Sequence, residues 1–182
     1  MCDDCKTRHD EAAIGRRQFM RLAAAGAGAS VVLAAATPEA QASGKAKALM
    51  LSCMDYRLVD DFVYFMAKEG LNDAYDHVVL AGASLGATHE KFAAWHATFW
   101  SHLDVAIQLH HVEEVVVLDH RDCGAYKLAL GAEAVDTPEK ETEAHARTML
   151  AFSQAVREKH PELKVRGYLM ALDGSTEEVR LT

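Results

Sequence analysis

The segment EEVVVLDH, at residues 113–120, places four aliphatic side chains in succession with no polar residue between them. A continuous apolar run of this kind is typical of a strand that is buried on both faces, as in a parallel sheet covered by helices. Three further runs have the same character, namely KALMLSC (47–53), HVVLAG (77–82) and LKVRGYLMAL (163–172). These runs predict four strands, and residues 173–182 are expected to form a turn and an end segment.

Stretches with helical periodicity separate the predicted strands. They lie at residues 57–70, 88–111, 124–130 and 138–160. Gly70 is suited to end the first helix, and Thr137 followed by Pro138 is suited to begin the last. The second helix has an apolar stripe that includes Phe99, whereas Trp100 lies off this stripe and is free to face another subunit. This order predicts an α/β fold with three layers: a mainly parallel sheet of four to five strands, in the order 2-1-3-4, with helices on both faces.

The first 42 residues differ in character from the rest of the chain. They contain the arginine pair Arg16 and Arg17, then a weakly apolar stretch rich in Ala and Gly, then Ala-Gln-Ala at positions 40–42. This pattern resembles a twin-arginine export signal with a cleavage site, although an uncleaved amphipathic tail is the alternative. The apolar stretch is too short and too weakly hydrophobic for a stable membrane span. We therefore expect a signal segment at 1–42, a single folded domain at 43–182, and an exported or periplasmic protein.

Charge and cysteine content narrow the possible functions. The net charge of the chain is −8, and residues 1–42 carry equal numbers of acidic and basic side chains, so the domain keeps this charge. An acidic protein without clustered Lys and Arg is not expected to bind nucleic acid. Of four cysteines, Cys2 and Cys5 lie at the start of residues 1–42 with His9 nearby, where a metal or redox role is open. The domain itself holds only Cys53 and Cys123.

Three potential metal ligands are expected to meet at one edge of the sheet. Cys53 ends the first predicted strand, and His120 and Cys123 follow the third. In the order 2-1-3-4 these strands are neighbours, and ligands bind where the carboxyl ends of such strands meet. Two thiolates and one imidazole form a typical zinc set, and three protein ligands leave a fourth position for water. The alternatives are a disulfide between Cys53 and Cys123, or two buried inert thiols.

Two motifs around these residues carry a resemblance to a known family. CMDYR (53–57) and HRDCG (120–124) resemble the C-x-D-x-R and H-x-x-C signatures of the β-class carbonic anhydrases, and the likeness covers most of residues 47–172. The resemblance implies that Cys53, His120 and Cys123 bind Zn²⁺ and that Asp55 and Arg57 form a catalytic dyad. It also implies a parallel α/β sheet and an assembly of dimers or multiples of dimers, so we expect at least a homodimer.

The expected reaction is the reversible hydration of CO₂ to bicarbonate by a zinc-bound hydroxide. Zinc lowers the pKa of a bound water, and an ionised carboxylate beside that water can orient it. Arg57 can keep Asp55 ionised through its opposite charge and a bidentate hydrogen bond. The family also allows this aspartate to become a fourth zinc ligand, so both roles of Asp55 stay open. Gly82 and Gly124 are expected to border the substrate.

The chain departs from the family pattern in two places. Where the family commonly has Arg-Asn before Ala-Gly, this chain has Val79 and Leu80, and the residue before the histidine is Asp119 rather than Gly. A more apolar wall would suit COS or CS₂ as substrate, and a zinc-holding scaffold without turnover is a further alternative. Asp119 either supports the metal ligands or faces solvent. GASLGA (82–87) is expected to be a turn; the alternative is an anion cradle at a helix N-terminus, but the segment lacks the lysine of a phosphate-binding loop.

Overall fold

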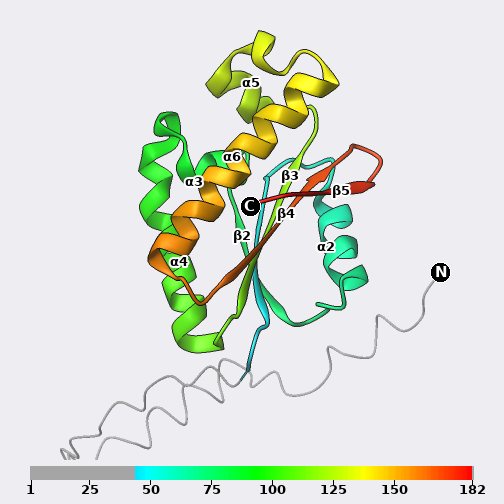
Figure 1. Cartoon of the computed structure of the whole chain (residues 1–182). Coiled ribbons are helices and arrows are strands. Elements are labelled where there is room, and N and C mark those ends of the chain that lie inside the picture. Colours follow the sequence, from blue (N-terminus) through cyan, green and yellow to red (C-terminus); the bar gives the residue numbers. More distant parts are fainter. Residues whose placement is uncertain (1–43, 182) are drawn as a thin grey trace, which may run out of the picture. The chain divides into compact units, whose positions relative to one another are not determined.

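The computed structural model describes residues 44–181, which form a mixed sheet with helices on both faces (Figure 1). The strands are β1 (Ala48–Ser52), β2 (Tyr75–Val79), β3 (Glu114–His120), β4 (Lys164–Met170) and β5 (Thr176–Val179). Their spatial order is β2-β1-β3-β4-β5, with parallel pairing from β2 to β4 and β5 antiparallel to β4. The predicted fold class and strand order are thereby confirmed, and β5 is the fifth strand, in the segment expected to be a turn and an end.

The helices cover the sheet in two layers. They are α2 (Val59–Lys68), α3 (Ser84–Thr88), α4 (Ala93–His110), α5 (Gly124–Leu130) and α6 (Pro138–Lys159), with 3₁₀ turns η2 (Glu90–Phe92) and η3 (Ala132–Val135). In Figure 1, α2 lies on one side of the sheet while α4 and α6 lie on the other. Thr137 caps α6 as predicted, because its hydroxyl accepts a hydrogen bond from the Lys140 N–H at 3.3 Å, with Pro138 as the first helical residue. Within residues 44–181, no helix combines the length and apolar character that a membrane crossing requires.

Two apolar clusters fill the space between the layers. Because side chains alternate along a strand, Met50 of β1 points toward the cluster that contains Phe62 and Met66 of α2. Its neighbour Leu51 belongs to the opposite cluster, which contains Phe99 of α4. Strands β1 and β3 are almost completely buried, and both contribute to each cluster. This explains why their sequences lack the polar–apolar alternation of a half-exposed strand.

The segment between β2 and α4 differs from the prediction. GASLGA, expected to be a turn, instead contributes its last four residues to the short helix α3, and the single helix expected at 88–111 begins only at Ala93. The break falls at His89, whose backbone is extended and whose ring nitrogen Nδ1 accepts a hydrogen bond from the Lys91 N–H at 3.2 Å. Trp100 is partly buried in the α4 layer, with the ammonium group of Lys159 lying 5.2 Å from its ring centroid. The signal-like segment, Cys2 and Cys5 lie outside the described residues.

Candidate metal centre

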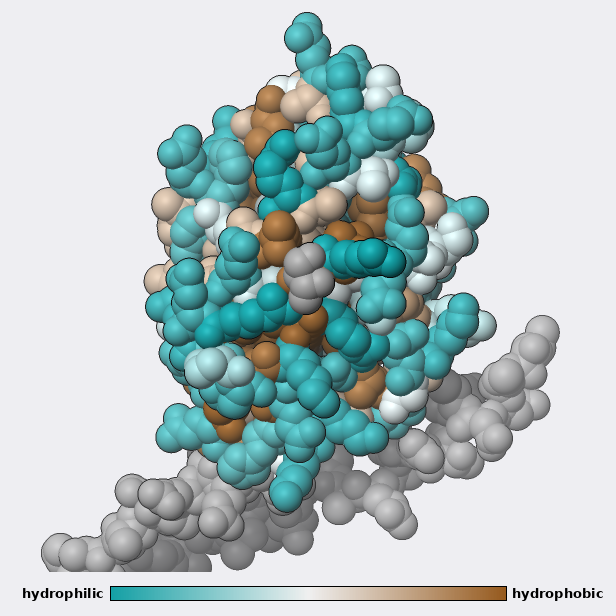
Figure 2. Space-filling model, in the orientation of Figure 1, coloured by the Kyte–Doolittle hydropathy of each residue, from teal (hydrophilic) through white to brown (hydrophobic). Residues whose placement is uncertain are grey.

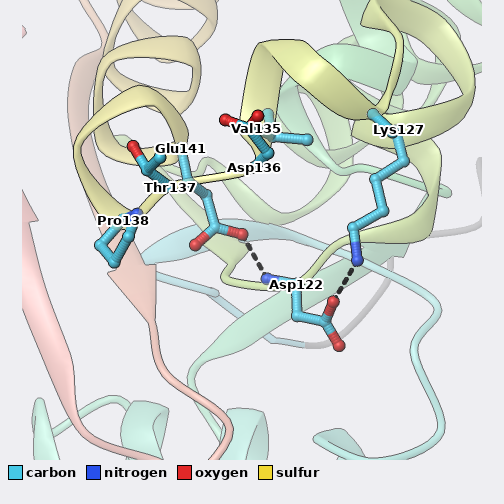
Figure 3. A pocket seen from close by; sticks show the side chains of 8 residues that line it. Asp122, Lys127, Val135, Asp136, Thr137, Pro138 and Glu141 are labelled. Carbon is cyan, nitrogen blue, oxygen red and sulfur yellow. Dashed lines mark hydrogen bonds and ion pairs between the residues drawn. The ribbon is translucent and has the colours of Figure 1, made fainter.

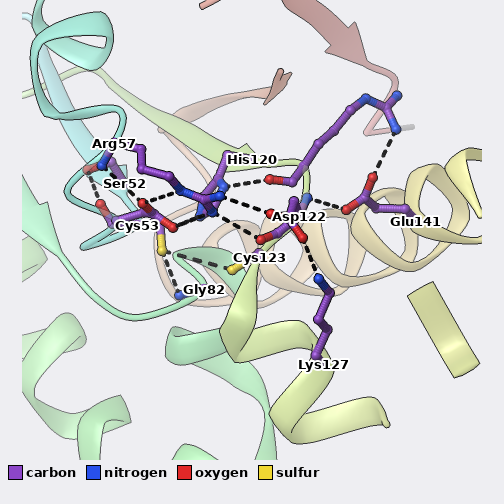
Figure 4. Close-up of polar contacts among 11 residues, drawn as sticks. Ser52, Cys53, Arg57, Gly82, His120, Asp122, Cys123, Lys127 and Glu141 are labelled. Carbon is purple, nitrogen blue, oxygen red and sulfur yellow. Dashed lines mark hydrogen bonds and ion pairs between the residues drawn. The ribbon is translucent and has the colours of Figure 1, made fainter. Parts of the chain in front are cut away.

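The three predicted ligands meet at the carboxyl ends of β1 and β3. These strands are parallel neighbours, with Ser52 opposite Leu118, so the residues that follow them emerge at the same edge. Cys53 comes directly after β1, His120 is the last residue of β3, and Cys123 is the residue before α5. All three side chains are buried, and their ligand atoms lie within 4.8 Å of one another (Figure 4). No other group of this composition occurs within residues 44–181.

The two sulfur atoms are spaced for a shared cation. Both cysteines are free, and their Sγ atoms are 4.0 Å apart, so the disulfide alternative is not realised in this structure. Two sulfurs bound at about 2.3 Å in a tetrahedral zinc site are separated by roughly 3.8 Å. Cys53 is also held by the backbone, because the Gly82 N–H donates a hydrogen bond to its sulfur at 3.2 Å. The distance between the two sulfurs therefore fits one tetrahedral ion.

The imidazole of His120 presents one free nitrogen to the sulfurs. Its Nδ1 lies 2.8 Å from the backbone carbonyl oxygen of Arg121, an acceptor, so Nδ1 carries the proton and donates it there. This leaves Nε2 with a lone pair, and Nε2 is buried with no hydrogen-bond partner in the described part of the chain. A buried nitrogen of this kind is costly unless it binds something. The residues thus fit a zinc ion: Cys53, His120 and Cys123 would hold it.

The electrostatics of the ligands favour a cation in the same place. The pKa of Cys53 is lowered to about 4, chiefly by its hydrogen bond with the Cys123 thiol, with smaller contributions from His120 and Gly82. The pKa of Cys123 is raised because it donates that bond, is buried, and faces a neighbouring thiolate. Burial lowers the pKa of His120, but the negative charges of the neighbouring Cys53 thiolate and Asp55 carboxylate help to raise it by more. The thiol pair therefore keeps one proton that a divalent cation would displace.

Asp55 and Arg57 form a paired dyad at the rim of this cluster. The Arg57 side chain donates to both carboxylate oxygens, from Nε to Oδ1 at 2.9 Å and from Nη2 to Oδ2 at 2.8 Å. The backbone N–H of Arg57 also donates to Oδ1 at 3.0 Å. These hydrogen bonds hold the pKa of Asp55 at about 2, so the carboxylate is ionised at neutral pH. Its Oδ2 atom lies 3.7 Å from Nε2 of His120.

Comparison with known proteins places the chain in a family. Residues 43–180 match the model of a family described as "Putative carbonic anhydrase". This match spans most of the chain. The chain belongs to this family. Two proteins from the genus Rickettsia are similar to it, and both are named as uncharacterized proteins. The one from Rickettsia conorii is 42% identical over 135 residues, covering 74% of this chain and 73% of its own length. The one from Rickettsia bellii is 41% identical, covering 74% and 82%.

Solved structures of β-carbonic anhydrases share the fold. Isoform I from Trichomonas vaginalis superposes with a TM-score of 0.50 at 18% identity, covering 75% of this chain and 84% of that one. CafD from Aspergillus fumigatus superposes with a TM-score of 0.51 at 11% identity, covering 79% and 94%. At such low identity the likeness concerns the fold alone. Family membership and fold together support a carbonic anhydrase-like enzyme.

The loop between His120 and Cys123 is anchored by charged partners. Asp122 has a left-handed backbone and lies between Arg57, whose Nη1 donates to it at 2.9 Å, and Lys127, with which it also forms an ion pair. Its backbone N–H donates to the Glu141 carboxylate of α6. Asp122 also lines an open cleft of about 460 Å³ bounded by α5, η3 and the start of α6 (Figure 3). The sequence indicated no role for Asp122, because its partners Arg57 and Glu141 are 65 and 19 positions away along the chain.

Asp119, the departure from the family pattern, does not face solvent. It is 1% exposed, and its carboxylate accepts hydrogen bonds from the backbone and hydroxyl of Ser84, from Tyr126 and from His145. Tyr126 and His145 are both buried. A polar residue inside the apolar run of a central strand was the only available signal for this network.

Four residues were expected to shape the substrate site, namely Gly82, Gly124, Val79 and Leu80. They differ in their positions and contacts. Gly82 lies against Cys53 through its N–H, whereas Gly124 is the first residue of α5, directly after Cys123. Val79 is about half exposed at the end of the edge strand β2, and Leu80 packs partly into the core cluster beneath α4 and α6. At least part of the Leu80 side chain therefore packs against the core.

Proposed function

We propose that this protein catalyses the reversible hydration of CO₂ to bicarbonate with a zinc ion held by Cys53, His120 and Cys123. The observation that carries the proposal is the convergence of these ligand atoms within 4.8 Å, with the unpartnered Nε2 of His120 among them. Membership of the carbonic anhydrase family supports the reaction type. Two sulfurs and one nitrogen use three positions of a tetrahedral ion and leave the fourth for water, as catalytic zinc sites do.

The ion would act as a Lewis acid that makes water nucleophilic near neutral pH. The role that we assign to Asp55 is to accept, at Oδ2, a hydrogen bond from the water that attacks the carbon of CO₂. With a pKa of about 2, Asp55 does not retain a proton at neutral pH, so it orients the water and the proton leaves to solvent or buffer. Arg57 keeps this carboxylate ionised and fixes its plane through two side-chain hydrogen bonds.

The test is stopped-flow CO₂ hydration by the full chain after zinc loading, with metal content measured on the same sample. We expect hydration well above the buffer rate. Asp55→Asn should retain zinc and slow hydration by about 10- to 100-fold, because the amide presents a donor where an acceptor is needed. Glu143→Gln, which neutralises an exposed carboxylate on α6, is the matched control and should leave the rate unchanged. Zinc bound with a rate equal to that of buffer would favour the scaffold alternative instead.

Hydrolysis of COS or CS₂ on the same scaffold is the second candidate from the sequence. This candidate was suggested by the apolar wall expected at Val79 and Leu80. Because Leu80 packs into the core and Val79 ends an edge strand, their positions do not favour this candidate over CO₂. Measuring COS, CS₂ and CO₂ turnover on one zinc-loaded preparation decides between them, and a larger kcat/KM for either sulfur compound would replace our assignment.

We further propose that the protein is exported and forms at least a homodimer. Arg16 and Arg17 support export, and replacing both by lysine should leave the protein in the cytoplasm with residues 1–42 attached.

The homodimer is supported by exposed apolar side chains next to the dyad, including Met54 and Tyr56. In contrast, hydrophilic residues cover most of the face seen in Figure 2. Two related β-carbonic anhydrases from Sordaria macrospora are described as tetrameric. Light scattering after gel filtration should give at least twice the monomer mass.

A further inference from the structure

A fully buried carboxylate lies one residue before the histidine ligand. Moving an ionised carboxylate out of water is costly unless hydrogen bonds replace the lost hydration. Asp119 obtains such bonds from three separate elements. Oδ1 accepts from the Ser84 N–H at 3.1 Å, and Oδ2 accepts from the Ser84 hydroxyl at 2.6 Å. Oδ2 also accepts from the Tyr126 hydroxyl at 2.5 Å and from Nδ1 of His145 at 3.0 Å. Asp119 therefore joins β3 to α3, α5 and α6.

Two of these partners lead directly to the cysteine ligands. Ser84 follows Gly82 and Ala83, and the N–H of Gly82 is the donor to the Cys53 sulfur. Ala83 has a φ of 41° and a ψ of −102°, a conformation that an alanine holds only when its surroundings fix it. The hydrogen bonds of Ser84 to Asp119 lie immediately after this residue. Asp119 thus fixes the end of the turn that presents the Gly82 N–H.

Tyr126 provides the corresponding link to the second cysteine. It is the third residue of α5, and α5 begins directly after Cys123. Tyr126 is buried, and its hydroxyl contacts both Asp119 and, at 3.2 Å, Ser84. The third ligand, His120, is joined to Asp119 by the peptide bond itself. Because successive residues of a strand point to opposite faces, the carboxylate is directed away from the cage while its neighbour is directed into it.

We propose that Asp119 is a positioning residue that fixes the three ligand-bearing segments relative to one another, so that the metal cage is formed before the metal binds. The inference rests on the proposed metal site and adds to it a residue that touches no ligand atom. If Asp119 served only the stability of the fold, its loss would lower stability without a specific loss of metal affinity. The two roles are therefore separated by measuring affinity and stability on the same variants.

The experiment titrates Co²⁺ into the metal-free full chain, with the sulfur-to-cobalt absorption as the signal and circular dichroism as the measure of folding. Asp119→Asn keeps the shape of the side chain but places an amide group among four donors. We expect this variant to be folded at 25 °C, to bind Co²⁺ at least about 10-fold more weakly than the native chain, and to show shifted ligand-field bands. Loss of a supporting residue around a metal site typically costs 10- to 100-fold in affinity.

Val156→Ala is the matched control, because Val156 is buried near the far end of α6 and its truncation lowers stability without touching the network. It should bind Co²⁺ with native affinity. Equal affinity of Asp119→Asn and the native chain would overturn the inference. If Asp119→Asn does not fold, the question is decided by Tyr126→Phe and Ser84→Ala, each of which removes a single hydrogen-bond partner of Asp119. Weaker Co²⁺ binding in both variants supports the inference. Native Co²⁺ affinity in both overturns it. A native chain that binds no Co²⁺ would instead refute the metal site.

Discussion

Gly82 and Gly124, both expected from the sequence to border the substrate, should respond in opposite ways to alanine. Gly82 has a φ of +76°, and a Cβ there would lie 3.0 Å from Cβ of Ala125 and 3.3 Å from Cβ of Leu85. The left-handed conformation costs a residue with a Cβ roughly 1–2 kcal/mol. Crowding in a packed region adds about 1 kcal/mol or more. We therefore expect Gly82→Ala to lower the free energy of unfolding by about 2–3 kcal/mol.

Gly124 offers the matched comparison. It is the first residue of α5, its φ lies outside the left-handed region, and a Cβ there would meet no atom within 4 Å. Alanine is a better helix residue than glycine by up to about 1 kcal/mol. Gly124→Ala should therefore be neutral or slightly stabilising, although it lies beside a proposed ligand as Gly82 does.

Urea denaturation of the metal-free full chain, followed by the fluorescence of Trp95 and Trp100, measures these differences. Gly82→Ala should also shift the thermal midpoint downward by roughly 5–10 °C. Because the added methyl displaces the N–H that donates to Cys53, its Co²⁺ affinity should fall as well. The reasoning is refuted if the two variants lose equal stability, or if Gly82→Ala unfolds at the native urea concentration. If Gly124→Ala keeps its stability and metal affinity but has a raised KM for CO₂, the result would support a place for Gly124 in the substrate site.

Two further predictions concern the ligands and the dyad. Cys123→Ser should lower zinc content sharply, as measured by metal analysis after dialysis, because a serine hydroxyl is not a thiolate at neutral pH; full occupancy would remove Cys123 from the ligand set. Arg57→Gln should lower stability by about 0.5–1 kcal/mol at pH 6, as expected for a partly exposed ion pair. Because the folded pKa of Asp55, about 2, lies below its usual value of 3.8, the stabilisation is complete above about pH 4 and is lost as the pH falls toward 2. The difference in urea midpoint between native chain and variant should thus shrink from pH 6 to pH 3, and a constant difference would contradict the ion-pair origin.

The ligand cluster could be anticipated from sequence because local patterns locate it. A strand buried on both faces has a continuous apolar run, so the polar residues that end it are conspicuous. Cys53 and His120 are such residues, and the parallel pairing of β1 with β3 brings them together at one edge. The dyad could be predicted from even less information, because Asp55 and Arg57 are two residues apart and their contact is local.

What the sequence did not reveal depends on contacts between distant residues. Ser84 and His145 are 35 and 26 positions away from Asp119, and nothing in a single sequence links them to it. The helical break at His89 likewise could not be seen in the apolar periodicity, because it is set by the ring that accepts the Lys91 N–H. Strand β5 has the sequence TEEV, which is mostly exposed, and it forms by pairing with β4 rather than by its own apolar pattern.

The adjacent pair Asp119 and His120 suggests why the end of a central parallel strand suits a metal cage. At this position one residue can point toward the ion while its neighbour points to the opposite side of the sheet, where helices are packed. The cage side requires an imidazole with an unpartnered nitrogen, and His120 provides it. The opposite side would ordinarily hold an aliphatic residue, which packs but does not specify the position of a turn. A carboxylate there requires directed donors, and Ser84 and Tyr126 are held where they supply them. At Asp119, four directed hydrogen bonds thus replace apolar packing on one face of β3. They fix the geometry of the proposed metal ligands on the opposite face.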